Sequence, residues 1–163
     1  MRSTRFVSIA TLAAFTACTH TTRPTDIGSG GTGDTGPQQT SQWGPAPSVF
    51  PPGAQFAVMQ GDPSKSGEPF TVRLRFPDGY LVPPHTHPTE EDVTVIAGTF
   101  LAGMGATVVE SDLHPLGRGD FAAIPANHAH YAKARGETIV QVNAIGPFAL
   151  TYVNANGAPI VSR

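Results

Sequence analysis

Apolar and polar residues alternate in short runs from residue 48 to the end of the chain. In the run FTVRLRF at 70–76, valine, leucine and phenylalanine fall on one face of an extended strand and the polar residues fall on the other. Runs of this kind predict strands at 54–60, 70–76, 92–98, 99–105, 120–125, 128–134, 138–146 and 148–154. Turn-forming triplets separate several of them, namely Pro77-Asp78-Gly79, Gly117-Arg118-Gly119 and Arg135-Gly136-Glu137. No segment keeps an apolar period of about 3.6 residues over three turns, so the pattern predicts an all-β domain built as a sandwich or closed barrel.

The composition supports a turn-rich β domain and narrows the choice of partners. The chain of 163 residues contains 18 glycines and 16 prolines, and its length suits one domain with some additional sequence. Its formal net charge is -2, and its lysines and arginines are scattered, without a stripe that could neutralise successive phosphates. We therefore expect no nucleic-acid partner.

The N-terminal end resembles an export signal. Two arginines precede an apolar stretch at 6–17 that is too short to span a bilayer, and Cys18, the only cysteine, follows it. The residues before Cys18 resemble a bacterial lipobox, although Phe15 stands where leucine is usual. We therefore predict a signal peptide at 1–17 and a lipidated Cys18 that anchors the protein in the cell envelope, facing the periplasm. The alternative is a soluble secreted protein in which the cysteine has no role.

Residues 18–47 are mostly threonine, glycine, proline, serine and glutamine, a composition that predicts a flexible tether. This leaves 48–163 as the folded domain. Trp43 is the exception within the tether: it either docks on the edge of the domain or remains a partly exposed linker aromatic. A single cysteine permits no intrachain disulfide, so the domain must be held by its core and by any metal that it binds.

Four side chains form a candidate metal site. His85 and His87 are two residues apart, so on a strand they project from the same face. Glu91 follows across a short connection at which the chain can turn back, and His130 lies on a later strand that an antiparallel barrel can place beside the first. Imidazoles with a carboxylate form a usual ligand set for a divalent ion and leave positions open for water or substrate. The alternative is that these histidines are ordinary core or surface residues.

The chain resembles a cupin, on the evidence of two motifs. The first cupin motif is met, with every spacing, by Gly79, His85, His87, Glu91 and Gly98. The second motif is met by Gly119, Pro125 and His130. Asn127 replaces its second glycine, but asparagine tolerates the left-handed backbone that a glycine supplies. Ala134 replaces its asparagine, which removes a polar contact but no metal ligand.

The resemblance covers 48–163 and implies a single jelly-roll β-barrel. It also implies that three histidines and one glutamate hold a metal, which corresponds here to His85, His87, His130 and Glu91. Such mixed ligands suit several divalent ions, so the identity of the metal stays open, with iron, manganese or zinc favoured.

Further residues are candidates for the walls of the site and for proton transfer. His128, Tyr131 and Glu90 are close to the ligands in sequence and could act as acids or bases, although His128 could equally be an exposed rim residue. His114 is interpreted as a surface residue. In 70–76 the apolar face is expected to enter the core, but an inward Arg73 would offer a partner to a carboxylate or phosphate. The candidate pocket residues are Arg73, Phe100, Met104, Gln141, Asn143, Phe148 and Tyr152.

Two classes of function remain open. One is an exported metal-dependent enzyme that acts on a small organic molecule, as a dioxygenase-like oxidoreductase or an isomerase. The other is a non-catalytic, metal-stabilised binding or sensor module tethered in the envelope, which the short chain with one bare barrel would suit. A homodimer is plausible in either case, because pairing would cover exposed sheet edges.

Overall fold

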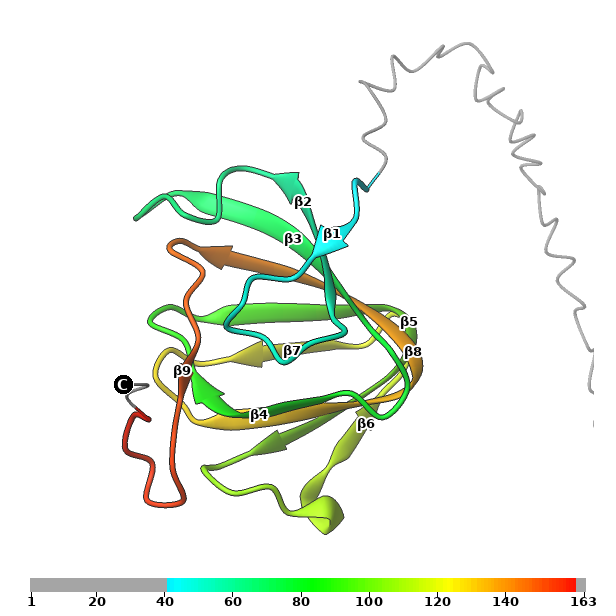
Figure 1. Ribbon diagram of the computed structural model, residues 1–163, viewed down its shortest axis with the longest axis vertical. Helices are drawn as coiled ribbons and strands as arrows, with labels where there is room; N and C mark the ends of the chain where they lie inside the picture. Colours follow the sequence, from blue (N-terminus) through cyan, green and yellow to red (C-terminus); the bar gives the residue numbers. More distant parts are fainter. Residues whose placement is uncertain (1–40, 161–163) are drawn as a thin grey trace, which may run out of the picture. The chain divides into compact units, whose positions relative to one another are not determined.

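The computed structural model describes residues 41–160, and the fold is all-β with one short 3-10 helix (Figure 1). The elements are β1 (Gly44–Pro45), β2 (Gln55–Gln60), β3 (Pro69–Phe76), β4 (Leu81–Thr86), β5 (Glu91–Met104), η1 (Glu110–Asp112), β6 (His114–Leu116), β7 (Phe121–Ile124), β8 (His130–Ile145) and β9 (Thr151–Tyr152). Within this range no helix is long and apolar enough to cross a membrane. The predicted signal peptide at 1–17, the lipidated Cys18 and the first part of the tether lie outside the described residues.

Two long antiparallel strands, β5 and β8, connect all parts of the sheet. One half of β8 pairs with β3 and the other half with β4, while β5 pairs with β8 along most of its length. The strand order is β1-β2-β3-β8-β4-β9, and β6 and β7 add to the other side of β5. Figure 1 shows β8 passing from beside β4 round to beside β3, so that the sheet curls over itself as in a jelly roll.

Both long strands bend at glycines, and this corrects part of the strand prediction. The sequence predicted separate strands at 92–98 and 99–105, yet β5 is continuous through Gly98, which has a φ of 75°. A Cβ at Gly98 would collide with the backbone of β8 at Glu137 and Thr138, so only glycine fits. Gly136, with a φ of 71°, bends β8 where the sequence predicted a turn. The register shifts of the β5–β8 pair occur at this bend, so the glycines curve the strands without ending them.

The core follows from the alternation in each strand. Val72, Leu74 and Phe76 of β3 are buried, as the pattern predicted. The opposite residues of β8, Val140 and Val142, are buried against them from the same face of the sheet. Burial of this continuous apolar face on folding stabilises the barrel.

Three further differences from the prediction concern β4, β6 and β9. The sequence did not indicate β4, which contains Pro83 and Pro84, because proline is rare inside strands. It also missed the short β6. The strand predicted at 148–154 is reduced to Thr151–Tyr152.

Trp43 docks on the outer face of the sheet. The guanidinium of Arg75 lies over its ring, 4.3 Å from the centroid, and the neighbouring strand β1 pairs with β2. Ordered structure therefore begins before residue 48, where the sequence placed the start of the domain.

Candidate metal centre

The ends of three strands bring the four predicted ligands together. His85 belongs to β4 and His87 follows directly after it, while Glu91 and His130 are the first residues of β5 and β8. His85 is the register partner of His130, which places the two on neighbouring strands. The predicted projection of His85 and His87 to one side is confirmed: their ring centroids are 4.9 Å apart.

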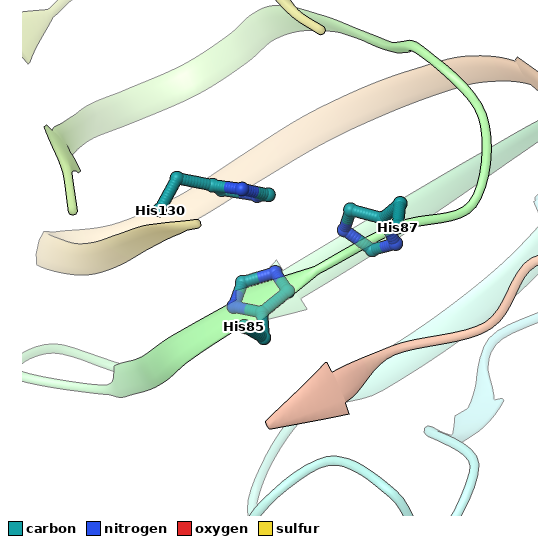
Figure 2. Close-up of side chains that lie close together, drawn as sticks. All are labelled: His85, His87 and His130. Carbon is teal, nitrogen blue, oxygen red and sulfur yellow. The ribbon is translucent and has the colours of Figure 1, made fainter. Parts of the chain in front are cut away.

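The three histidines form a compact buried cluster. One ring nitrogen of each lies within 4.8 Å of the other two. The centroid of His130 is 4.2 Å from that of His85 and 5.3 Å from that of His87. Figure 2 shows the three rings turned towards a common centre. Their residues are 4–6% exposed, so these imidazoles contact little bulk water.

Backbone carbonyls orient each of these imidazole rings. The Nδ1–H of His85 donates to Pro83 O at 2.7 Å, that of His87 to Ala149 O at 2.8 Å, and that of His130 to His128 O at 3.0 Å. A carbonyl oxygen can only accept, so in the neutral rings Nδ1 carries the hydrogen and Nε2 carries a lone pair. The backbone therefore prepares three Nε2 lone pairs for a metal ion.

Glu91 completes the donor set. Its Oε2 lies 3.4 Å from Nε2 of His87 and 3.4 Å from Nε2 of His130. Burial by itself would raise the pKa of this carboxyl, but the three neighbouring imidazoles, His130 first, outweigh it and lower the pKa whenever they hold a proton. The carboxyl is therefore placed to act as the anionic ligand beside the imidazoles.

The imidazoles of His85 and His87 resist protonation. Burial, followed by the proximity of His130 and His87, lowers the pKa of His85 to about 3. Burial also lowers the pKa of His87. The Nε2 atom of His87 is buried and has no hydrogen-bond partner among the described residues. A buried acceptor without a donor is costly, and a divalent cation coordinated by Nε2 would remove that cost. The donor set therefore fits a divalent metal such as iron, manganese or zinc.

The cluster faces a cavity of about 220 Å³ inside the barrel. Most of its walls are aliphatic or aromatic, including Leu74, Val93 and Val142. The exposed lining residues that face the cavity are Met104, the register partner of His130, and His114, the register partner of Ala102, and these two mark the mouth. Ala123 is also exposed, but its register partner is Asp92 on the outer face of the sheet. A ligand in the cavity could therefore reach the metal ligands from solvent without unfolding the barrel.

The structure divides the predicted wall residues into two groups. Phe100, Met104 and Phe148 line the cavity. Arg73 and Gln141 lie on the outer face of the sheet, where Arg73 Nε donates to Gln141 Oε1 at 3.2 Å. Asn143 is on the same outer face and donates to Thr71 Oγ1.

The alternation of side chains along β8 explains why Gln141 and Asn143 do not line the cavity as predicted. On β8 the buried Val140 and Val142 alternate with Gln141 and Asn143, so the polar pair must face outward. Tyr152 is also not among the described residues that line the cavity. Its ring centroid is 6.1 Å from that of His85, and its hydroxyl donates to Val49 O.

The three proton-transfer candidates occupy different surroundings. His128 is exposed, as one of the two sequence interpretations expected. Glu90 is exposed beside a groove on the outer face. Tyr131 contributes to the cavity wall, but its ring packs over Gly103, and its hydroxyl accepts from the N–H of Val109 and donates to the carbonyl of Val109. Tyr131 therefore holds the loop before β6.

The sequence correctly placed His114 on the surface but did not indicate that it also lines the mouth of the cavity. Its pairing with Ala102 on β5 brings it there, and the isolated three-residue strand gave no periodic signal. The departure at Asn127 is accommodated as expected, because this residue adopts the left-handed conformation with a φ of 63°.

Comparisons with known proteins agree with this architecture. Residues 72–146 match a family model described as a cupin domain. An acetylacetone dioxygenase from Acinetobacter johnsonii is 15% identical, with a TM-score of 0.56 over 78% of this chain and 89% of the other. A proposed acetylacetone dioxygenase from Methylibium petroleiphilum is 19% identical, with a TM-score of 0.58 over 74% and 81% of the two chains.

An RmlC-like cupin from Shewanella frigidimarina is 16% identical, with a TM-score of 0.53 over 68% of this chain and 87% of the other. No curated protein matches the sequence. At these identities the structural likeness shows that the domain has the cupin fold.

Proposed function

We propose that this protein, which has the cupin fold and whose residues 72–146 match a cupin-domain model, is a metal-dependent enzyme that acts on a small organic molecule. His85, His87 and His130 would hold one divalent ion through Nε2, and Glu91 would hold it through its carboxylate. The observation that carries the proposal is the convergence of three backbone-oriented imidazoles and the carboxyl group of Glu91 on a cavity that reaches solvent. A bound ion would supply Lewis-acid or redox chemistry to a molecule in that cavity.

The open cavity favours an enzyme over a binding or sensor module. A structural metal is usually closed off by its protein ligands, whereas a catalytic metal keeps a position for substrate. Here the ligands form part of the cavity wall, so an ion among them would face the space available to a substrate. Two structurally similar proteins are named as acetylacetone dioxygenases, which supports oxygen-dependent oxidation as the first reaction class to examine.

The metal proposal is tested by elemental analysis of the full chain purified without chelator or added metal. We expect nearly one equivalent of a divalent metal, loss of that metal in His130→Ala, and retention in His128→Ala. The second variant is a matched control because the group of His128 that contacts His130 is its backbone carbonyl, which alanine keeps. Equal metal content in all three proteins, or none in the wild type, would contradict the proposal.

The catalytic proposal needs a separate measurement. Protein loaded with iron(II) should consume oxygen in the presence of one or more small oxidisable compounds, and isomerisable compounds form a second panel. Metal-loaded protein that turns over nothing in either panel would favour the binding or sensor module.

We also propose that the protein is exported and anchored by acylation of Cys18. The support comes from the sequence at 1–18, which combines a basic start, a short apolar stretch and the lipobox-like residues. Membrane fractionation with fatty-acid labelling should show label in the wild type and none in Cys18→Ser. Unlabelled wild-type protein in the soluble fraction would favour secretion instead.

A further inference from the structure

We propose that the cavity takes a small molecule that is uncharged when it enters, with an oxygen-bearing end at the histidine cluster and an apolar remainder against the walls. This inference depends on the proposed function, because it supposes that the ligand meets a metal held by the cluster. It goes further by naming the chemical class of the ligand.

The first argument is the absence of cations from the walls. Of the described residues that line the cavity, none is a lysine or an arginine. A ligand carboxylate or phosphate inside would lose its hydration and gain no side-chain cation in return, which is strongly unfavourable. A single ion beside Glu91 could compensate part of one negative charge but not several.

The second argument is that nearby cations are used elsewhere. Arg73 is bound to Gln141 on the outer face, and Arg75 lies over Trp43. These arginines alternate along β3 with Leu74 and Phe76, which line the cavity. Turning an arginine inward would require a one-residue shift of the strand, and that shift would expose the apolar face.

The third argument is the scarcity of polar groups in the walls. The Nδ1–H groups of the cluster are already bonded to backbone carbonyls. The hydroxyl of Tyr131 uses both its donor and an acceptor position on Val109. This leaves the Nε2 atoms, the carboxylate of Glu91 and the ring of His114 at the mouth. A sugar or other polyhydroxylated molecule would lose hydrogen bonds with water that these walls could not replace.

The fourth argument is size. The cavity of about 220 Å³ corresponds to about seven water molecules at their liquid volume. It is smaller than the roughly 300–1,000 Å³ of sites for drug-sized ligands. An apolar molecule of this size gains from leaving water, whereas a charged or highly hydroxylated one does not.

A matched pair of compounds tests the inference on full-length protein loaded with zinc. Pentane-2,4-dione and malonate have similar size and the same 1,3 spacing of oxygens, but the methyl groups of the dione are charged oxygens in malonate. We expect calorimetry to show that the dione binds at least about tenfold more tightly, with a negative heat-capacity change from apolar burial. Malonate binding that is equal or tighter, or binding of neither compound to zinc-loaded protein, would overturn the inference.

Zinc content measured on the same sample separates the two proposals. Protein that takes up no zinc would refute the proposed metal site, and the ligand inference would fall with it. Protein that holds zinc but prefers malonate would refute the ligand class alone.

Two variants at similarly exposed positions give a second test. Met104→Arg adds a cation at the exposed mouth and should tighten malonate binding by about twofold to fivefold, the range of an exposed ion pair. Phe121→Arg adds the same charge at an exposed position that is not among the described residues lining the cavity, and it should leave malonate binding unchanged. An equal effect of both variants would indicate general attraction of the anion to the surface and would contradict a mouth at Met104.

Discussion

Replacing Glu91 by glutamine should stabilise the metal-free protein while weakening its response to metal. In the wild type, Oε2 of Glu91 lies 3.4 Å from Nε2 of both His87 and His130. A carboxylate only accepts hydrogen bonds, and so does the Nε2 of a neutral imidazole whose hydrogen is on Nδ1. Without a metal, these atoms gain from their proximity only when a proton is held between them.

A glutamine amide removes this conflict because it can donate to one Nε2, and it is also easier to bury than a carboxylate. One new neutral hydrogen bond contributes about 1 kcal/mol, and the uncharged side chain adds to that, so we expect a gain of about 1–2 kcal/mol in the free energy of unfolding. With an unfolding entropy of about 2.1 cal/mol/K per residue over the described domain, the gain corresponds to a rise of about 4–8 °C in Tm.

The stabilisation that metal adds should change in the opposite direction. A metal at about one hundred times its Kd stabilises the wild type by about 2.7 kcal/mol, or roughly 10 °C. Loss of the anionic ligand should lower metal affinity by about tenfold or more, and each tenfold removes about 1.4 kcal/mol of that stabilisation.

Thermal unfolding followed by circular dichroism, with chelator and with a fixed zinc concentration, measures both effects. Glu90→Gln is the matched control: the residue is the exposed neighbour of Glu91, and its substitution should shift neither Tm. A metal-free Glu91→Gln protein that is less stable than the wild type, together with an unchanged zinc response, would refute the reasoning.

Three further predictions concern the bend, the acid limit and the loop before β6. Gly98→Ala should lower the free energy of unfolding by more than about 2 kcal/mol, because φ is 75° and a Cβ would collide with β8. Gly79 has a similar φ, but a Cβ there would meet no neighbouring atom, so Gly79→Ala should cost only about 1 kcal/mol in denaturant unfolding. The metal-free protein should lose stability as the pH falls from about 6.5 to 3, and His85 should contribute about 1.4 kcal/mol per pH unit to this loss. The reason is that burial lowers the pKa of His85 to about 3, so in this range the unfolded chain takes up a proton that the folded protein does not. A flat stability profile by chemical denaturation would contradict this. Tyr131→Phe should lose both hydrogen bonds to Val109, cost about 1–3 kcal/mol and speed amide hydrogen exchange at Val109; unchanged exchange there would exclude the anchoring role.

The ligand cluster was predictable because each step depended on local spacing. Because His85 and His87 are two residues apart on an extended chain, their side chains must project to the same side. The short connection after His87 keeps Glu91 close to them. The partner strand of His130 was less determined, but the second motif of the cupin resemblance indicated it. The confirmed meeting of the three histidines therefore required no knowledge of the remaining topology.

The bends at Gly98 and Gly136 show where local reasoning failed. A glycine with positive φ is equally consistent with a turn that ends a strand and with a bulge that bends it. The difference depends on whether another strand continues alongside, and here each long strand supports the other across the bend. The place of His114 at the mouth was missed for a related reason, since it comes from pairing with β5 and not from neighbours in sequence.

At this site the backbone orients the metal ligands, while side chains elsewhere form the mouth of the cavity. The acceptors that orient the three imidazoles are main-chain carbonyls, so the metal ligands depend little on the identity of neighbouring side chains. The mouth is formed by residues of β5 and β6, including Met104 and His114, which are exposed and do not belong to the buried core. Substitutions at the mouth can therefore change which molecule enters without moving the ligands. Separate parts of the barrel therefore control the two properties. Substitutions in the histidine cluster should change metal content, and substitutions at the mouth should change which ligand binds.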